Sequence, residues 1–127
     1  MEPLILPGTD DTPEINFDAK KGILRISGKS LPEDVIGFYS PVFSWLERYV
    51  SDPHDKTTLE VKVVYFNSAS QRALNELLSI ISRVNLKGKE AEVIWHYHED
   101  DDEILEAGQE YADITNLPFV FKSFVAN

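Results

Sequence analysis

The sequence predicts a single α/β domain in which helices pack on a mixed β-sheet that starts with an N-terminal β-hairpin. Strand-like segments alternate with segments of helical spacing, in the order β-β-α-β-α-β-α-β. The chain has 127 residues, which fits one domain spanning residues 1–127, and no repeat or linker interrupts it. Because helices connect the later strands, we expect those strands to pair in parallel.

The first third of the chain predicts the hairpin and one helix. Residues 14–18 and 23–28 are the two strands, and Gly22 in the turn between them can adopt a positive φ. We expect the helix to begin at Pro32, since proline suits a first helical position. Pro41 interrupts its spacing, so we expect a kink or a restart there. Its core face consists of Val35, Phe38, Tyr39, Val42, Leu46 and Tyr49.

The middle of the chain predicts a central strand and a second helix. Residues 57–66 alternate in hydrophobicity and end in the unbroken apolar run 64–66. That run predicts burial on both faces of the sheet. The helix that follows is expected to stop near Gly88. Its core face consists of Leu74, Leu77, Leu78 and Ile81.

The last third predicts a strand, a helix and a final strand. Residues 91–97 form the strand, and the acidic run 99–103 suits the N-terminus of a third helix. Residues 119–125 form the last strand, after a proline that ends the helix. The core side of the third helix consists of Ile104, Gly108 and Tyr111.

Composition excludes several classes of function. The formal net charge is −10, from 22 acidic and 12 basic residues, and an acidic surface repels nucleic acid and anionic lipids. No signal peptide or apolar run of about 20 residues is present. The absence of cysteine excludes disulfides, thiolate metal sites and a cysteine nucleophile. We therefore expect a cytoplasmic protein that binds neither nucleic acid nor membranes.

No motif indicates catalysis or a cofactor. The sequence contains no nucleophile elbow, P-loop or dinucleotide fingerprint, so we expect no catalytic residues and no enzyme. His96 and His98 share one face of a strand, next to the carboxylates of residues 99–102. They could ligate a divalent metal, but a specific site needs a third preorganised ligand. A small metal-binding protein is therefore an alternative, and no metal site is predicted.

The junction between the central strand and the second helix carries two interpretations. Ser68 and Gln71 match a capping box, in which the serine hydroxyl accepts a hydrogen bond from a helix N–H. The same helix N-terminus offers unpaired N–H groups and a partial positive charge. A phosphate on Ser68 or Ser70 would add about −1.5 to −2 charge there and so decide which partner docks.

Several fragments, taken in their order along the chain, resemble the SiaC family of regulatory phosphoproteins, and the resemblance covers nearly the whole sequence. The fragments are Leu6-Pro7-Gly8-Thr9, Thr12-Pro13-Glu14-Ile15, Phe17-Asp18, Phe38-Tyr39-Ser40-Pro41-Val42, Trp45-Leu46, Tyr65-Phe66-Asn67-Ser68, Trp95-His96-Tyr97 and Leu117-Pro118-Phe119. The resemblance implies a STAS-like fold, similar to that of anti-sigma-factor antagonists.

The resemblance also implies a partner-switching function. A kinase phosphorylates a hydroxyl at the start of the second helix, and a PP2C-type phosphatase removes the phosphate. The unphosphorylated form binds and activates a diguanylate cyclase, which promotes cyclic-di-GMP signalling and aggregation or biofilm growth. An anti-sigma-factor antagonist that acts on a different partner is the alternative.

The resemblance places the phosphorylated hydroxyl directly after the asparagine that ends the strand. That position holds threonine in the family pattern and Ser68 here, while Ala69 replaces a second hydroxyl residue of the pattern. Ser70 is the second candidate for modification. The partner-binding residues implied are Asn67, Ser68, Ala69, Ser70, Gln71 and Arg72.

Overall fold

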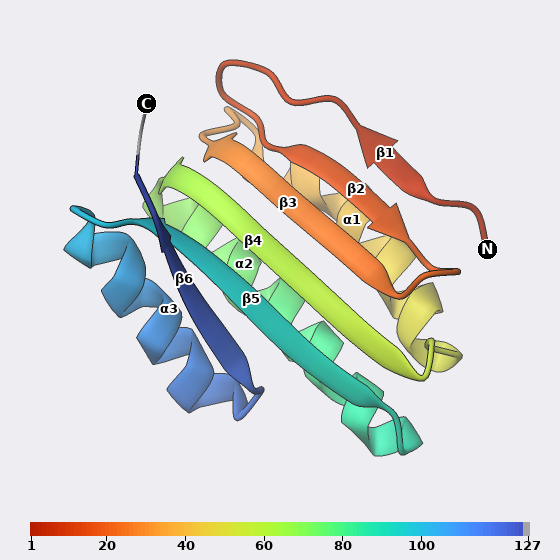
Figure 1. Ribbon diagram of the computed structural model, residues 1–127. Helices are drawn as coiled ribbons and strands as arrows, with labels where there is room; N and C mark the ends of the chain where they lie inside the picture. The colour runs from red at the N-terminus through yellow and green to blue at the C-terminus, as the bar shows by residue number, and fades with distance from the viewer. Residues whose placement is uncertain (126–127) are drawn as a thin grey trace.

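The computed structural model describes residues 1–125. Six strands form one mixed sheet in the order β1-β2-β3-β4-β5-β6 (Figure 1). The strands are β1 (Leu4–Leu6), β2 (Glu14–Asp18), β3 (Ile23–Ser30), β4 (Lys56–Phe66), β5 (Glu90–His98) and β6 (Phe119–Phe124). The helices are α1 (Val35–Ser51), α2 (Ser68–Ser82), the 3-10 helix η1 (Arg83–Lys87) and α3 (Asp102–Thr115). The predicted α/β class is confirmed, and the short β1 and the 3-10 helix η1 were not predicted as separate elements.

The pairing of the strands follows from their connections. β1, β2 and β3 pair antiparallel, and Gly22 takes a φ of 68° in the hairpin between β2 and β3, as predicted. β3, β4, β5 and β6 pair in parallel, because a helix carries the chain back between each of them. The predicted parallel pairing of the later strands is therefore confirmed.

All three helices cover the same face of the sheet. Right-handed crossovers that advance in one direction across a sheet place their helices on one side, and α1 and α2 lie behind the strands in Figure 1. Trp45 of α1 packs on Phe17 of β2, and Trp95 of β5 donates a hydrogen bond from Nε1 to the Ile104 carbonyl of α3, at 2.9 Å. The opposite face carries exposed or half-buried side chains, such as Glu60 and His96.

Helix α1 differs from the prediction at its start, and it does not restart at Pro41. It begins at Val35, where the Asp34 side chain accepts a hydrogen bond from the Gly37 N–H, and Pro32 lies before it. The helix then continues through Pro41 to Ser51 without a restart. A proline inside a helix costs about 3 kcal/mol, and the buried face of α1 offsets this cost. That face consists of Tyr39, Val42, Trp45, Leu46, Tyr49 and Val50.

The end of β4 also differs from the prediction. The strand is central, as expected, but Val64 and Tyr65 are 45% and 54% exposed, so it is not buried on both faces. Its pairing with β3 skips one residue, from Gly28 opposite Val63 to Lys29 opposite Tyr65. This bulge reverses the alternation of side chains and turns Phe66 into the core. The apolar run 64–66 therefore marks a β-bulge and not a strand buried on both faces.

The remaining helix ends agree with the sequence patterns. η1 continues from α2 and stops at Gly88, which has a φ of 73°. The Asp101 side chain caps α3 by accepting a hydrogen bond from the Ile104 N–H at 3.0 Å. Ile104, Gly108 and Tyr111 form the buried side of α3, as predicted. Within residues 1–125, no helix combines the length and the hydrophobicity required to cross a bilayer.

Candidate functional site

The junction between β4 and α2 is capped by Asn67, which corrects the predicted capping box at Ser68. The Asn67 Oδ1 accepts a hydrogen bond from the Ser70 N–H at 2.8 Å, and its carbonyl accepts one from the Gln71 N–H at 2.9 Å. Asparagine is as good an N-cap as serine, and the bulge in β4 delivers Asn67 to that position with extended backbone angles. Ser68 is therefore the first helical residue, and its hydroxyl is not required for capping.

The two candidate serines lie in opposite environments. Ser68 is exposed, whereas Ser70 is 0% exposed. The Ser70 hydroxyl donates to the Ser30 carbonyl and accepts from the Ser30 hydroxyl, both at 2.9 Å. The Ser30 hydroxyl is also 2.6 Å from the Tyr39 hydroxyl of α1. We call Ser30, Tyr39 and Ser70 the hydroxyl cluster.

The hydroxyl cluster joins the end of β3, α1 and the first turn of α2. Ser30 has one proton, which it donates to Ser70, so the Tyr39 hydroxyl donates to Ser30. Burial raises the pKa of Tyr39, although the hydrogen bond with Ser30 opposes that change. Tyr39 therefore stays neutral and retains its proton for the cluster. Every described hydroxyl in the cluster has a partner.

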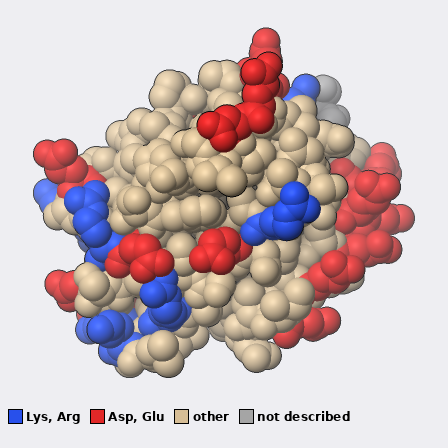
Figure 2. Space-filling view, turned by 180° about the vertical axis from the view of Figure 1, so that it is seen from behind, with Lys and Arg blue, Asp and Glu red and all other residues tan. Residues whose placement is uncertain are grey.

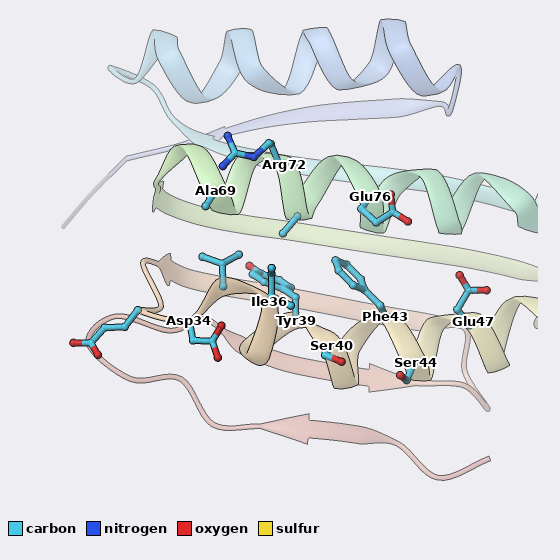
Figure 3. A pocket seen from close by; sticks show the side chains of 13 residues that line it. Asp34, Ile36, Tyr39, Ser40, Phe43, Ser44, Glu47, Ala69, Arg72 and Glu76 are labelled. Carbon is cyan, nitrogen blue, oxygen red and sulfur yellow. The ribbon is translucent and has the colours of Figure 1, made fainter.

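The exposed Ser68 is the first residue of α2, and a groove lies on each side of this helix. The α1–α2 groove has a volume of about 650 Å³, and residues of α1 and α2 face one another across it (Figure 3). Its apolar lining consists of Val35, Ile36, Tyr39, Phe43, Ala69 and Ala73. Its carboxylates are Glu33, Asp34, Glu47 and Glu76.

The α2–α3 groove lies on the other side of α2. Ser68, Gln71 and Arg72 line it from α2, and Tyr111 lines it from α3. The Tyr111 hydroxyl donates a hydrogen bond to the Gln71 carbonyl at 2.8 Å, which fixes α3 to the first turns of α2. Burial is the largest cause that raises the pKa of Tyr111 above its usual value, and the nearby Glu110 adds to it.

The helix-covered face has an uneven distribution of charge (Figure 2). Acidic side chains gather on the side of α3 with no basic side chain among them, because α3 contains no lysine or arginine. By contrast, the first turn of α2 contains no acidic residue. The partial positive charge at the start of α2 is therefore not offset by a carboxylate of its own first turn.

The structure brings the predicted partner-binding residues together but gives them different exposures. Ser68, Gln71 and Arg72 are exposed, Asn67 and Ala69 are half-buried, and Ser70 is buried. The sequence patterns did not indicate the α1 side of the candidate site. Ile36 is 83% exposed at the mouth of the α1–α2 groove, and an apolar residue off the core face of its helix is the signal that could have indicated it.

The two histidines do not build a metal site. His96 Nε2 lies 2.9 Å from Glu60 Oε1, and His98 Nδ1 lies 3.9 Å from Asp100. In the part of the chain that the structure describes, no three histidine or acidic side chains are grouped to hold a metal ion. This arrangement does not favour the metal-binding alternative.

Comparison with known proteins connects this geometry to a family. The model of the family described as "SiaC family regulatory phosphoprotein" matches residues 6–124. The chain belongs to the SiaC family. A relative from Pseudomonas aeruginosa (strain UCBPP-PA14) is 28% identical over 123 residues, which cover 97% of this chain and 98% of the relative.

Solved structures of SiaC share the fold of this family member. SiaC of Pseudomonas aeruginosa matches with a TM-score of 0.88 and 27% identity, over 98% of this chain and 100% of that one. SiaC in a crystal structure of the diguanylate cyclase SiaD in complex with its activator SiaC also matches at 0.88 and 27%, over 95% and 99% of the chains. The SiaC family is therefore one of regulatory proteins, with an activator of a cyclase among them, and not of enzymes.

Proposed function

We propose that this protein is a phosphorylation-gated activator of a diguanylate cyclase. Its unphosphorylated form binds the cyclase and promotes cyclic-di-GMP signalling, with aggregation or biofilm growth as the result. The proposal is supported by membership of the SiaC family and by the similarity to SiaC bound to the cyclase SiaD. The observation that assigns the proposal to a residue is the exposed Ser68 at the start of α2, where it lines the α2–α3 groove.

Ser68 is the hydroxyl proposed to carry the phosphate. A kinase can reach its exposed side chain, whereas Ser70 is fully buried and uses its hydroxyl in two hydrogen bonds. A phosphate adds about −1.5 to −2 charge at neutral pH. The start of a helix favours such a charge by about 0.3–1 kcal/mol, and the first turn of α2 contains no carboxylate that would oppose it.

The surface proposed to contact the cyclase comprises the first turns of α2 and the walls of its grooves. The predicted residues of this surface are Asn67, Ser68, Ala69, Ser70, Gln71 and Arg72. Ser70 is buried and does not contact the partner itself; its hydrogen bonds to Ser30 hold the first turn of α2 in place. A dianion on Ser68 repels acidic groups of a docked partner and costs desolvation energy against apolar ones.

The partners proposed for the modification cycle are a protein kinase and a PP2C-type phosphatase. Both act at Ser68, and the fraction of phosphorylated protein sets the activity of the cyclase. We place the protein in the cytoplasm, as one STAS-like regulatory domain over residues 1–127. It binds neither nucleic acid nor membranes in this proposal and requires no cofactor.

The test combines modification mapping with a binding assay. Co-expression with the cognate kinase should add one phosphate to the intact mass, and peptide mapping should place it on Ser68. Ser68→Ala should bind the cognate cyclase like the unmodified protein, whereas Ser68→Asp should bind more weakly. Ser79, an exposed serine on the same helix, provides the matched controls Ser79→Ala and Ser79→Asp, which should both bind normally. Phosphate on another residue, or equal binding of the two Ser68 variants, would contradict the proposal.

A further inference from the structure

Arg72 lies one helical turn after Ser68 and lines both grooves beside α2. We propose that Arg72 is the residue through which a phosphate on Ser68 controls the binding of the cyclase. In the unphosphorylated protein its guanidinium pairs with a carboxylate of the partner. In the phosphorylated protein the same guanidinium pairs with the phosphate and is lost to the partner. This inference rests on the proposed function and specifies its regulation.

The spacing and direction of the side chains favour a pair between Ser68 and Arg72. Residues four apart on a helix are neighbours on its surface. Helical side chains lean toward the N-terminus, and Figure 3 shows the Arg72 side chain extending toward the start of α2, the end at which Ala69 lies. An anion at the earlier position and a cation four residues later is also the better orientation for an ion pair.

Arg72 is available for such a pair. Within residues 1–125, none of the ion pairs of the protein involves Arg72. Glu76 lies four residues later, but a cation before an anion is the weaker orientation, and the Arg72 side chain extends away from it (Figure 3). An exposed guanidinium without a carboxylate partner can form a two-pronged pair with a phosphate or with a carboxylate of another protein.

The charges around Arg72 indicate why this residue matters to a partner. It is the one basic residue among the described residues that line the α1–α2 groove, whose other charged residues are the carboxylates of Glu33, Asp34, Glu47 and Glu76. A partner carboxylate over this groove therefore meets one cation and several anions. If a phosphate on Ser68 takes that cation, the partner carboxylate is left unpaired beside like charges, which weakens binding.

The first experiment measures the pair within the protein itself. Phosphoserine is incorporated at position 68 by genetic encoding, and its second pKa, ordinarily about 6, is measured by phosphorus NMR. In Arg72→Gln this pKa should rise by about 0.15–0.4, the change expected for the loss of one helical ion pair at the second ionisation. Arg48→Gln is the matched control, because Arg48 is an exposed arginine in the last turn of α1. An equal pKa in all three proteins would overturn the inference.

The second experiment measures the pair with the partner. Calorimetry with the cognate cyclase should show about tenfold weaker binding for unphosphorylated Arg72→Gln, the loss of one charge-assisted hydrogen bond. Arg72→Lys should recover part of this loss, and Arg48→Gln should bind normally. Unchanged affinity of Arg72→Gln, or an equal loss in Arg48→Gln, would overturn the inference. The encoded phosphoserine needs no kinase, so the NMR experiment tests the role of Arg72 independently. Failure of the kinase to modify Ser68 would therefore count against the proposed function and not against the pair between Ser68 and Arg72.

Discussion

Substitution of Ser70 by alanine should destabilise the protein, because the buried hydroxyl takes part in two hydrogen bonds. It donates to the Ser30 carbonyl and accepts from the Ser30 hydroxyl. Each bond contributes about 1 kcal/mol net. In this variant the Ser30 carbonyl still accepts a hydrogen bond from the Asn67 N–H, at 3.3 Å, and the Ser30 hydroxyl is still bonded to the Tyr39 hydroxyl. Neither group of Ser30 is therefore left without a partner. We therefore expect a loss of about 1–2 kcal/mol in the free energy of unfolding.

Urea denaturation followed by tryptophan fluorescence measures this loss. In a thermal melt the same change should lower Tm by about 4–8 °C for a domain of this size. Ser68→Ala is the control, since it removes an exposed hydroxyl that caps nothing and should change stability by at most about 0.5 kcal/mol. Equal stability of Ser70→Ala and Ser68→Ala would refute the structural role of Ser70 and return both serines to the same standing as phosphorylation sites.

Two further substitutions test the packing of α3 and the exposed face of the sheet. Gly108→Ala should cost about 1–3 kcal/mol in the free energy of unfolding, measured by urea denaturation, because the added Cβ would lie 2.6 Å from Trp95 Nε1. Wild-type stability would show that α3 can shift away from Trp95. Glu60→Gln should reduce the loss of stability on acidification. Burial raises the pKa of Glu60, but hydrogen bonds from His96 and Arg25 outweigh it, so the pKa is lowered overall. A lowered carboxylate pKa contributes stability above the unfolded value of about 4.3 and loses it as the pH falls. Identical slopes for both proteins in melts from pH 6 to pH 3 would contradict this assignment.

The sequence predicted those parts of the fold that depend on local periodicity. The alternation in β4 and the apolar spacing of α2 and α3 each report one buried face, and a single face is sufficient to place a strand or a helix. The errors occurred where tertiary contacts override a local preference. Pro41 disfavours a continuous helix, but the aromatic side chains of α1 pack against the sheet and hold the helix through it.

The sequence patterns identified the junction between β4 and α2 as the candidate site, but they did not show the structural role of each residue there. Ser68 and Asn67 are both good caps, and which of them occupies the N-cap depends on where β4 ends. The bulge between β3 and β4 sets that end, and a bulge depends on pairing with a distant strand. The burial of Ser70 likewise depends on Ser30, which lies 40 residues earlier in the chain. Local patterns therefore identify a cluster of hydroxyls but cannot show which of them is exposed.

The order of the strands explains why α2 suits the proposed switch. Each crossover advances one strand in the same direction, so the helices follow one another across one face, and α2 packs between α1 and α3. The α1–α2 groove and the α2–α3 groove lie on the two sides of α2; Ser68 lines the second of them, and Arg72 lines both. A charge added to Ser68 therefore acts directly on a partner in the α2–α3 groove, and through the proposed pair with Arg72 it also affects a partner in the α1–α2 groove. At the start of α3 the same phosphate would join the carboxylates of Asp102 and Glu103.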